Sequence, residues 1–232
     1  PWKEGNLPTG NRITQVTGLP SPSWRKLNAG VASTKDTSEQ FDETCGMLED
    51  ESKVDVDHAK LNGDEAAYRA SRDKIKQEAF AQSFATALFY ESVSTNPERI
   101  HGLTPRYPGT SGYTSSGYTL AGTNAGTNAH SIWLVTWDLD KVYGIYPKGS
   151  SAGLTVEDIG KQRVLDSGSN SFMAYCTRMQ WKCGIAVEDY RYLVRYQWDP
   201  DDANFDDAEK GVYLAMRKML NTIYRRGSTS RF

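Results

Sequence analysis

The residues closest to a catalytic motif are Gly149-Ser-Ser-Ala-Gly153, which match the G-x-S-x-G pattern of a nucleophile elbow. In that geometry the serine lies on a sharp turn after a strand, and a histidine later in the chain is its general base. The three histidines, at positions 58, 101 and 130, all come earlier, and Pro147 and Lys148 separate the serine from the preceding strand. The pattern therefore favours a glycine-rich turn over a serine hydrolase that uses Ser151.

The other candidates for chemistry are short patterns without the partners that they need. Residues 23–26 and 71–74 match S-x-x-K, but no S-D-N or K-T-G element accompanies them. The sequence has no Walker loop, G-x-G-x-x-G or H-E-x-x-H motif, and its histidines and cysteines are too scattered for a zinc site. Acidic groups such as Asp138 with Asp140 flank turns, which favours capping roles. We expect no catalytic residue, metal or cofactor, and this favours a structural role.

Length and charge exclude several classes of protein. The 232 residues are enough for one large domain or two small ones with a substantial core. The net charge of −2 gives no overall field to hold nucleic acid or an anionic membrane. No apolar run approaches the roughly 18 residues of a membrane helix, and no signal peptide opens the sequence. An odd number of cysteines without a C-x-x-C pair indicates folding in a reducing compartment: Cys45, Cys176 and Cys183.

A polar hairpin is predicted near the start of the sequence. Residues 12–17 and 33–44 read as extended segments, yet residues 33–40 have polar side chains on both faces. Such a ribbon has little reason to lie on its own domain, and two isolated strands are marginal in water. Open strand edges also invite pairing with another chain. The hairpin therefore indicates a subunit that neighbouring copies complete.

Helical patterns follow the hairpin. A short helix is predicted over residues 52–61, ended by Asn62-Gly63. Asp64 is placed to cap a second helix over 64–91, which contains no glycine or proline and would be roughly 40 Å long. Its apolar residues recur at spacings of three and four and form one stripe: Ile75, Ala79, Phe80, Phe84, Ala87 and Leu88.

Strand patterns dominate the second half of the chain. Strands are predicted over 131–137, 142–146, 172–182 and 190–198, with a final helix over 206–224. In the third strand the larger side chains alternate onto one side: Met173, Tyr175, Thr177, Met179 and Trp181. Residues 109–130 are rich in Gly, Ser and Thr and read as a long surface loop. The fold class is α+β.

The order of these elements resembles the major capsid proteins of tailed bacteriophages, which have the Hong Kong 97-type shell fold. Seven stretches are similar to one family of these coat proteins: residues 18–28 (GLPSPSWRKLN), 44–49 (TCGMLE), 87–91 (ALFYE), 102–107 (GLTPRY), 131–135 (SIWLV), 144–149 (GIYPKG) and 190–195 (YRYLVR). The similarity covers most of residues 5–200. The Gly/Ser/Thr-rich loop departs from the family pattern.

The resemblance implies a division of the chain. Residues 1–11 would be an N-terminal arm and 12–45 the extended E-loop. The peripheral domain would comprise 46–94, with the spine helix at 64–91, and 171–200. The axial domain would comprise 95–170 and 201–232, and would be incomplete because such proteins usually continue further.

The resemblance also implies the function and the partners. The protein would be a non-enzymatic subunit of an icosahedral head shell that encloses a double-stranded DNA genome. It would be assembled in the bacterial cytoplasm from hexamers and pentamers of itself and would reside in the virion. Scaffold, portal or decoration proteins are possible further partners, contact with the packaged DNA would be weak and nonspecific, and no membrane is involved.

Contacts between copies are expected at two places. One is the hairpin tip, with Trp24, Arg25 and Lys26, unless Trp24 packs on its own domain. The other is an acidic run that could meet a basic patch on a neighbour, from which Asp42, Glu43, Glu49 and Asp50 are the candidates. Besides the hydrolase, a carbohydrate-binding β module is the alternative function, suggested by the aromatic residues Tyr113, Tyr118, Trp133 and Trp137.

Overall fold

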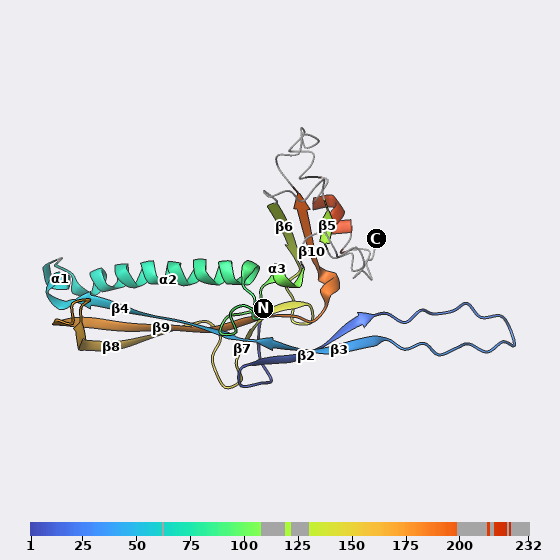
Figure 1. Ribbon diagram of the computed structural model, residues 1–232, viewed down its shortest axis with the longest axis horizontal. Coiled ribbons are helices and arrows are strands. Elements are labelled where there is room, and N and C mark those ends of the chain that lie inside the picture. Colours follow the sequence, from blue (N-terminus) through green and yellow to red (C-terminus); the bar gives the residue numbers. More distant parts are fainter. Residues whose placement is uncertain are drawn as a thin grey trace.

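The protein is elongated, with a folded body at one end and a protruding hairpin at the other (Figure 1). The computed structural model describes residues 1–61, 63–107, 119–121 and 130–198, and also 213, 216–221 and 223. Most of the predicted loop 109–130 lies outside the described residues. No described helix is long and apolar enough to cross a membrane.

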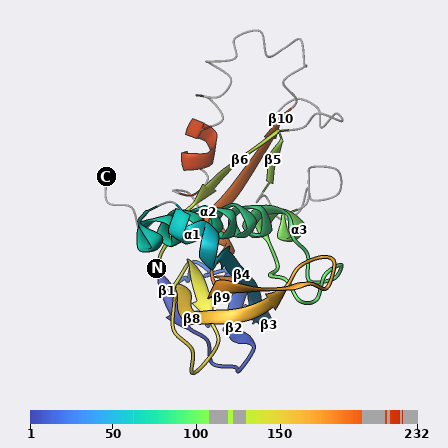
Figure 2. The same ribbon diagram turned by 90° about the vertical axis from the view of Figure 1, so that its left-hand side faces the viewer.

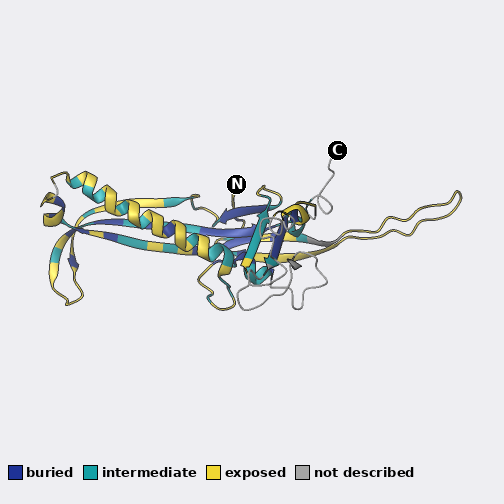
Figure 3. Cartoon of the chain, turned by 90° about the horizontal axis from the view of Figure 1, so that it is seen from above, coloured by how far each residue is buried: buried dark blue, intermediate teal, exposed yellow. Residues whose placement is uncertain are grey.

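The predicted hairpin forms from β2 (Gly10–Gly18) and β3 (Thr37–Thr44). The strands are antiparallel, and their register runs from Gly10 opposite Thr44 to Gly18 opposite Thr37. Residues 19–36 carry the ribbon onward outside regular strands and are exposed throughout (Figure 3). At the other end of the hairpin, Ile13 is buried in a cluster with Tyr143, Ile145 and Ala186. The hairpin is therefore anchored at its base and bare towards its tip.

The helix predicted over 52–61 begins later than expected. β4 (Gly46–Asp55) continues through residues 52–55, and only α1 (Val56–Leu61) is helical. Ser52 and Val54 are buried while Lys53 between them is exposed, which is the period of a strand. The ladder to β9 continues as far as Asp55 opposite Ala174. Asp55 then accepts hydrogen bonds from the backbone N–H groups of residues 57 and 58, which starts α1.

The long helix agrees closely with the sequence. α2 (Glu65–Tyr90) has 26 residues, and Asp64 caps it by accepting a hydrogen bond from the Ala67 backbone N–H. Phe80 is buried and Phe84 and Leu88 are partly buried, as the apolar stripe predicts. Two residues of the predicted stripe depart from this pattern, since Ile75 is 58% exposed and Ala79 is also exposed.

A five-stranded sheet forms the body beneath α2. Its order is β1 (Trp2–Glu4), β7 (Val142–Tyr146), β9 (Ser171–Val187) and β4, and β8 (Leu154–Leu165) also pairs with β9. β9 is 17 residues long, so one end lies between β4 and β8 and the other reaches β7. The face with Trp181 meets α2, where the rings of Phe84 and Trp181 are 4.6 Å apart.

The first residues of the chain belong to this sheet. β1 pairs in parallel with β7, and the Trp2 ring covers Gly144 so closely that a Cβ there would lie 2.6 Å from it. The segment expected as an arm thus begins as an edge strand of the chain's own sheet.

A second, three-stranded sheet stands on the same side of the body as α2 (Figure 2). Its order is β5 (Thr119–Ala121), β10 (Leu193–Trp198) and β6 (His130–Val135). The predicted C-terminal helix lies mostly outside the described residues, but residues 216–221 are helical and Met219 packs against Val194 and Tyr196. The short α3 (Leu103–Arg106) and a 3-10 turn, η1 (Tyr190–Tyr192), join the two sheets, and Leu103 and Leu193 share a core cluster there.

This pairing differs from the expected domain boundaries. The expectation places residues 171–200 in one unit and 95–170 in another, whereas β10 leaves β9 for the small sheet, and β7 and β8 join β9. The reason lies in the side chains, since Val194 and Tyr196 are buried against the small sheet's own helix. The sequence does not predict β8, because its side chains are mostly polar and exposed and lack an apolar alternation.

Candidate assembly interface

The hairpin tip presents apolar and basic side chains to solvent. Trp24 is fully exposed and Leu27 is 93% exposed, so Trp24 does not pack on its own chain. The chain reverses at residues 26–29, where the Ala29 backbone N–H donates to the Lys26 carbonyl and Asn28 adopts the left-handed conformation (φ 63°). Arg25 and Lys26 are also exposed. The tip therefore combines a large aromatic surface with two cations, which suits a contact with another molecule.

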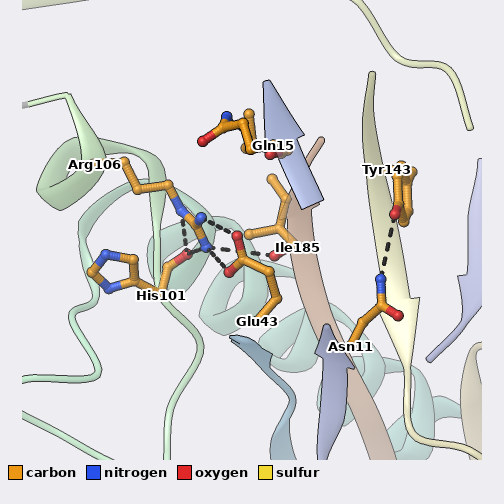
Figure 4. A network of polar contacts seen from close by, with 8 residues as sticks. Asn11, Gln15, Glu43, His101, Arg106, Tyr143 and Ile185 are labelled. Carbon is orange, nitrogen blue, oxygen red and sulfur yellow. Dashed lines mark hydrogen bonds and ion pairs between the residues drawn. The ribbon is translucent and has the colours of Figure 1, made fainter. Parts of the chain in front are cut away.

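The base of the hairpin is held on the β3 side by an ion pair. The Arg106 guanidinium binds both carboxylate oxygens of Glu43, one of them at 2.5 Å (Figure 4). Arg106 also donates to the backbone carbonyl of His101 at 2.9 and 3.2 Å, and reaches the Ile185 carbonyl at 3.5 Å. The side chains of Glu43 and Arg106 are only 5% and 15% exposed. This pair joins β3, α3 and β9 at one point.

Next to the ion pair lies a hollow of about 550 Å³, lined by residues of β3, α3 and the end of β9. The His101 side chain lines it. Burial, and next the charge of Arg106, lower the pKa of His101 below its usual value, so the imidazole is neutral at pH 7. The charge at the base of the hairpin is therefore carried by Glu43 and Arg106.

The β2 side of the base is held by a second polar network. Asn11 is buried and donates to the Tyr143 hydroxyl at 3.3 Å, and that hydroxyl donates to Glu188 at 2.8 Å. Burial, followed by the Glu188 carboxylate, raises the pKa of Tyr143 above its usual value, which keeps the hydroxyl protonated as a donor. Gln15 adds a hydrogen bond to the Val187 carbonyl at 3.3 Å. Both strands of the hairpin are thus tied to the body.

The predicted acidic contact residues all have partners within the chain. Glu43 is buried in its pair with Arg106. Contrary to the expectation, it is therefore not available to a neighbouring copy. The three others stay on the surface in ion pairs: Asp42 with Arg12 at 2.5 Å, Glu49 with Arg178 at 2.7 Å, and Asp50 with Lys76 at 2.6 Å. The hydrogen bond from Arg12 lowers the pKa of Asp42, and hydrogen bonds from Arg178 and Gln180 lower that of Glu49.

Arg106 and Tyr143 are functional candidates that sequence reasoning does not identify. Their partners Glu43 and Asn11 lie 63 and 132 residues away in the sequence. No local pattern can reveal such pairs, although Arg106 does fall within one of the family-like stretches.

The alternative chemistries find no support in the described residues. Gly149 and Gly153 adopt φ angles of 79° and 94°, which confirms the glycine-rich turn. The hollow around Ser151 is lined by Gln180 and Lys182 and by no histidine. No cluster of His, Cys, Asp or Glu in the described part of the chain could hold a metal ion. Trp133, offered as a sugar platform, packs against Phe89 and Tyr107. Trp137 is 47% exposed, while Tyr113 and Tyr118 lie outside the described residues.

Comparison with solved structures defines the fold as the Hong Kong 97-type shell fold. A chain of the near-atomic structure of bacteriophage Epsilon15 is 21% identical, with a TM-score of 0.66 over 100% of this chain and 69% of that one. The SrpI encapsulin complex of Synechococcus elongatus gives a TM-score of 0.52 at 11% identity, over 84% and 83% of the two chains. Microbacterium phage Oxtober96 gives 0.52 at 10% identity, over 84% and 88%.

The sequence itself identifies the family. A family model described as Major capsid protein GP7 matches residues 1–229, and the chain belongs to that family. A search of curated proteins gave no match. The protein is therefore a major capsid protein of a phage head shell, a structural component of the virion and not an enzyme. This confirms the function predicted from sequence and removes the hydrolase and carbohydrate-binding alternatives.

Proposed function

We propose that the protein assembles into an icosahedral shell around a double-stranded DNA genome, and that its hairpin is the E-loop, which lies on an adjacent copy. The observation that carries this proposal is the exposure of residues 19–36, including Trp24, on a ribbon that nothing in the described part of the chain covers. A two-stranded ribbon of this length is marginal in water alone. A neighbouring copy would supply the missing surface, and repeated heterologous contacts of this kind close into rings, here hexamers and pentamers.

The remaining elements are assigned to the two domains of the shell subunit. We assign the peripheral domain to β4 with α2 as its spine, together with β7, β8 and β9, which amends the expected boundaries. The axial domain would contain α3, the small sheet and the described C-terminal helix, and would pack around the centres of the capsomers. Residues 1–9 would be the N-terminal arm, docked on its own sheet through β1.

The contacts would be concentrated at the tip. Trp24 is suited to be a hot spot because aromatic anchors at the centre of an interface carry much of the binding energy. Arg25 and Lys26 would select an acidic surface on the neighbour. Asp42, Glu49 and Asp50 are weaker candidates because each already has a cation on its own chain. Scaffold, portal and decoration proteins, and weak contact with DNA, rest on the family resemblance alone.

Shortening the hairpin tests the proposal. Gly18 and Thr37 lie opposite each other in the ladder, so an Asn-Gly turn can replace residues 19–36 while the buried base stays intact. We expect a folded protein with unchanged circular dichroism that elutes as small species and forms no shells in electron micrographs. Shells of normal size from this variant would contradict the E-loop assignment. Removing all of 12–44 is a poorer test, because Ile13 and Glu43 are buried in the body.

A further inference from the structure

The base of the hairpin holds a buried ion pair that is not required for the hairpin to form. Glu43 is buried on β3 and paired with Arg106 on α3, and Arg106 also donates to carbonyls of His101 and Ile185. A hydrophobic pair of similar volume would generally serve stability as well or better, since burying two charges carries a desolvation cost. The pair does offer fixed geometry, because a guanidinium binds a carboxylate through two parallel hydrogen bonds in one plane.

Because the hairpin is long, the geometry at its base determines where its tip lies. Between Glu43 and Trp24 there are 19 residue steps, which span roughly 60 Å in extended conformation. A rotation of 10° at the base therefore moves the tip by about 10 Å, roughly the spacing between two packed sheets. Along residues 19–36 no contact with the body corrects such an error, since this segment is exposed throughout. The direction of the hairpin must be set at its base.

We propose that Glu43 and Arg106 are positioning residues for shell assembly. Their ion pair, together with the Asn11–Tyr143 hydrogen bond on the opposite strand, fixes the angle at which the hairpin leaves the body. They make no contact with a neighbouring copy themselves. Their effect on assembly comes from the position that they give to Trp24 at the tip. This inference rests on the proposed role of the hairpin as an intersubunit contact, and it adds residues that exposure and sequence pattern do not identify.

The test separates direction from stability. Glu43→Leu alone leaves Arg106 buried without its partner and should lower the melting temperature by roughly 6–20 °C. Adding Arg106→Met removes the second charge and should recover most of that loss. If the pair only stabilised the fold, the double variant would assemble again. We expect that it does not, and that the yield of shells stays at least tenfold below that of the unchanged protein.

Direction is measured in a Cys45→Ser background with two spin labels on exposed positions, at Ser33→Cys near the tip and Ala81→Cys on α2. The measurement uses subunits freshly dissociated from shells. The unchanged base should give a narrow distribution of distances between the labels, and the double variant a broad one. The matched control is Arg12→Met with Asp42→Leu, which makes the same exchange at an exposed ion pair on the same hairpin. This control should keep the narrow distribution.

Each outcome decides a separate question. A narrow distribution in the Glu43→Leu/Arg106→Met variant, or a normal yield of shells from it, overturns the positioning role. Shells from the hairpin-shortened protein overturn the proposed function instead. Should the double variant fail to fold, Arg106→Lys gives the same test, because lysine keeps the charge but loses the two-pronged geometry. A narrow distribution with normal assembly in that variant likewise counts against the inference.

Discussion

At the scale of single residues, the acidic run of this sequence is used mainly within the chain. Each of the four acids that sequence analysis offers for contacts with neighbours meets a cation on another strand or helix, as Glu49 does with Arg178 across β4 and β9. Exposed pairs of this kind contribute little individually at neutral pH. Two of the pairs make the folded protein sensitive to acid, because hydrogen bonds from Arg12 and Arg178 lower the pKa of Asp42 and of Glu49.

Replacing Arg178 should flatten the response to acid. The folded pKa of Glu49 lies below its ordinary value of 4.5, so the unfolded state binds more protons below that pH. The stabilisation is complete above about 4.5 and is lost as the pH falls through the lowered pKa. Arg178→Gln should therefore reduce the slope of the urea midpoint against pH below about 4.5. Lys26→Gln, at the solvated tip, is the control, and an equal change in both variants would contradict the argument.

Sequence reasoning is reliable for residues whose role depends on near neighbours. The turn at Gly149 follows from its glycines and from the missing histidine, and the exposure of Trp24 follows from the polarity around it. It fails for Glu43, which reads as one more acid in a solvated run. Nothing within several residues indicates a buried partner, because the arginine is supplied by α3, 63 positions later.

At the scale of elements, a segment with a weak local preference for helix or strand takes the structure that its neighbouring strand imposes. α2 is predicted almost to the residue, because its composition, cap and apolar stripe all agree. Residues 52–55 have a helical pattern but join β4, because β9 offers a continuous ladder there. The sequence does not predict β8 because its side chains are mostly polar, yet residues 154–165 form a strand by pairing with β9.

The apolar stripe of α2 gives a test with an internal control. Phe80 is 6% exposed, so Phe80→Ala should lower the free energy of unfolding by about 3–5 kcal/mol. Ile75 lies on the same helix and in the same predicted stripe but is 58% exposed, so Ile75→Ala should change it by no more than about 0.5 kcal/mol. Urea unfolding of the two variants in the hairpin-shortened protein gives the comparison without interference from assembly. A large loss for Ile75→Ala would mean that this helix face is covered.

At the scale of the whole molecule, the chain combines a packed body with a hairpin that has no packing partner among the described residues. The buried residues are concentrated where α2, the main sheet and the small sheet meet, while the hairpin is bare (Figure 3). In a closed shell each copy would donate one hairpin and receive one. A change at the tip then acts once per subunit, and its effect on the assembly equilibrium can be read from a single interface.

Trp24→Ala should therefore raise the protein concentration at which shells form. An aromatic hot spot contributes on the order of 2 kcal/mol, and with one such contact per subunit the threshold should rise roughly 30-fold. Ser38→Ala, at an exposed position of the same hairpin, should leave the threshold within about twofold. Light scattering across a dilution series measures both thresholds, and circular dichroism confirms that both variants are folded. Equal thresholds for the two variants would show that Trp24 makes no contact in the shell, and the contact would then have to lie elsewhere on the ribbon.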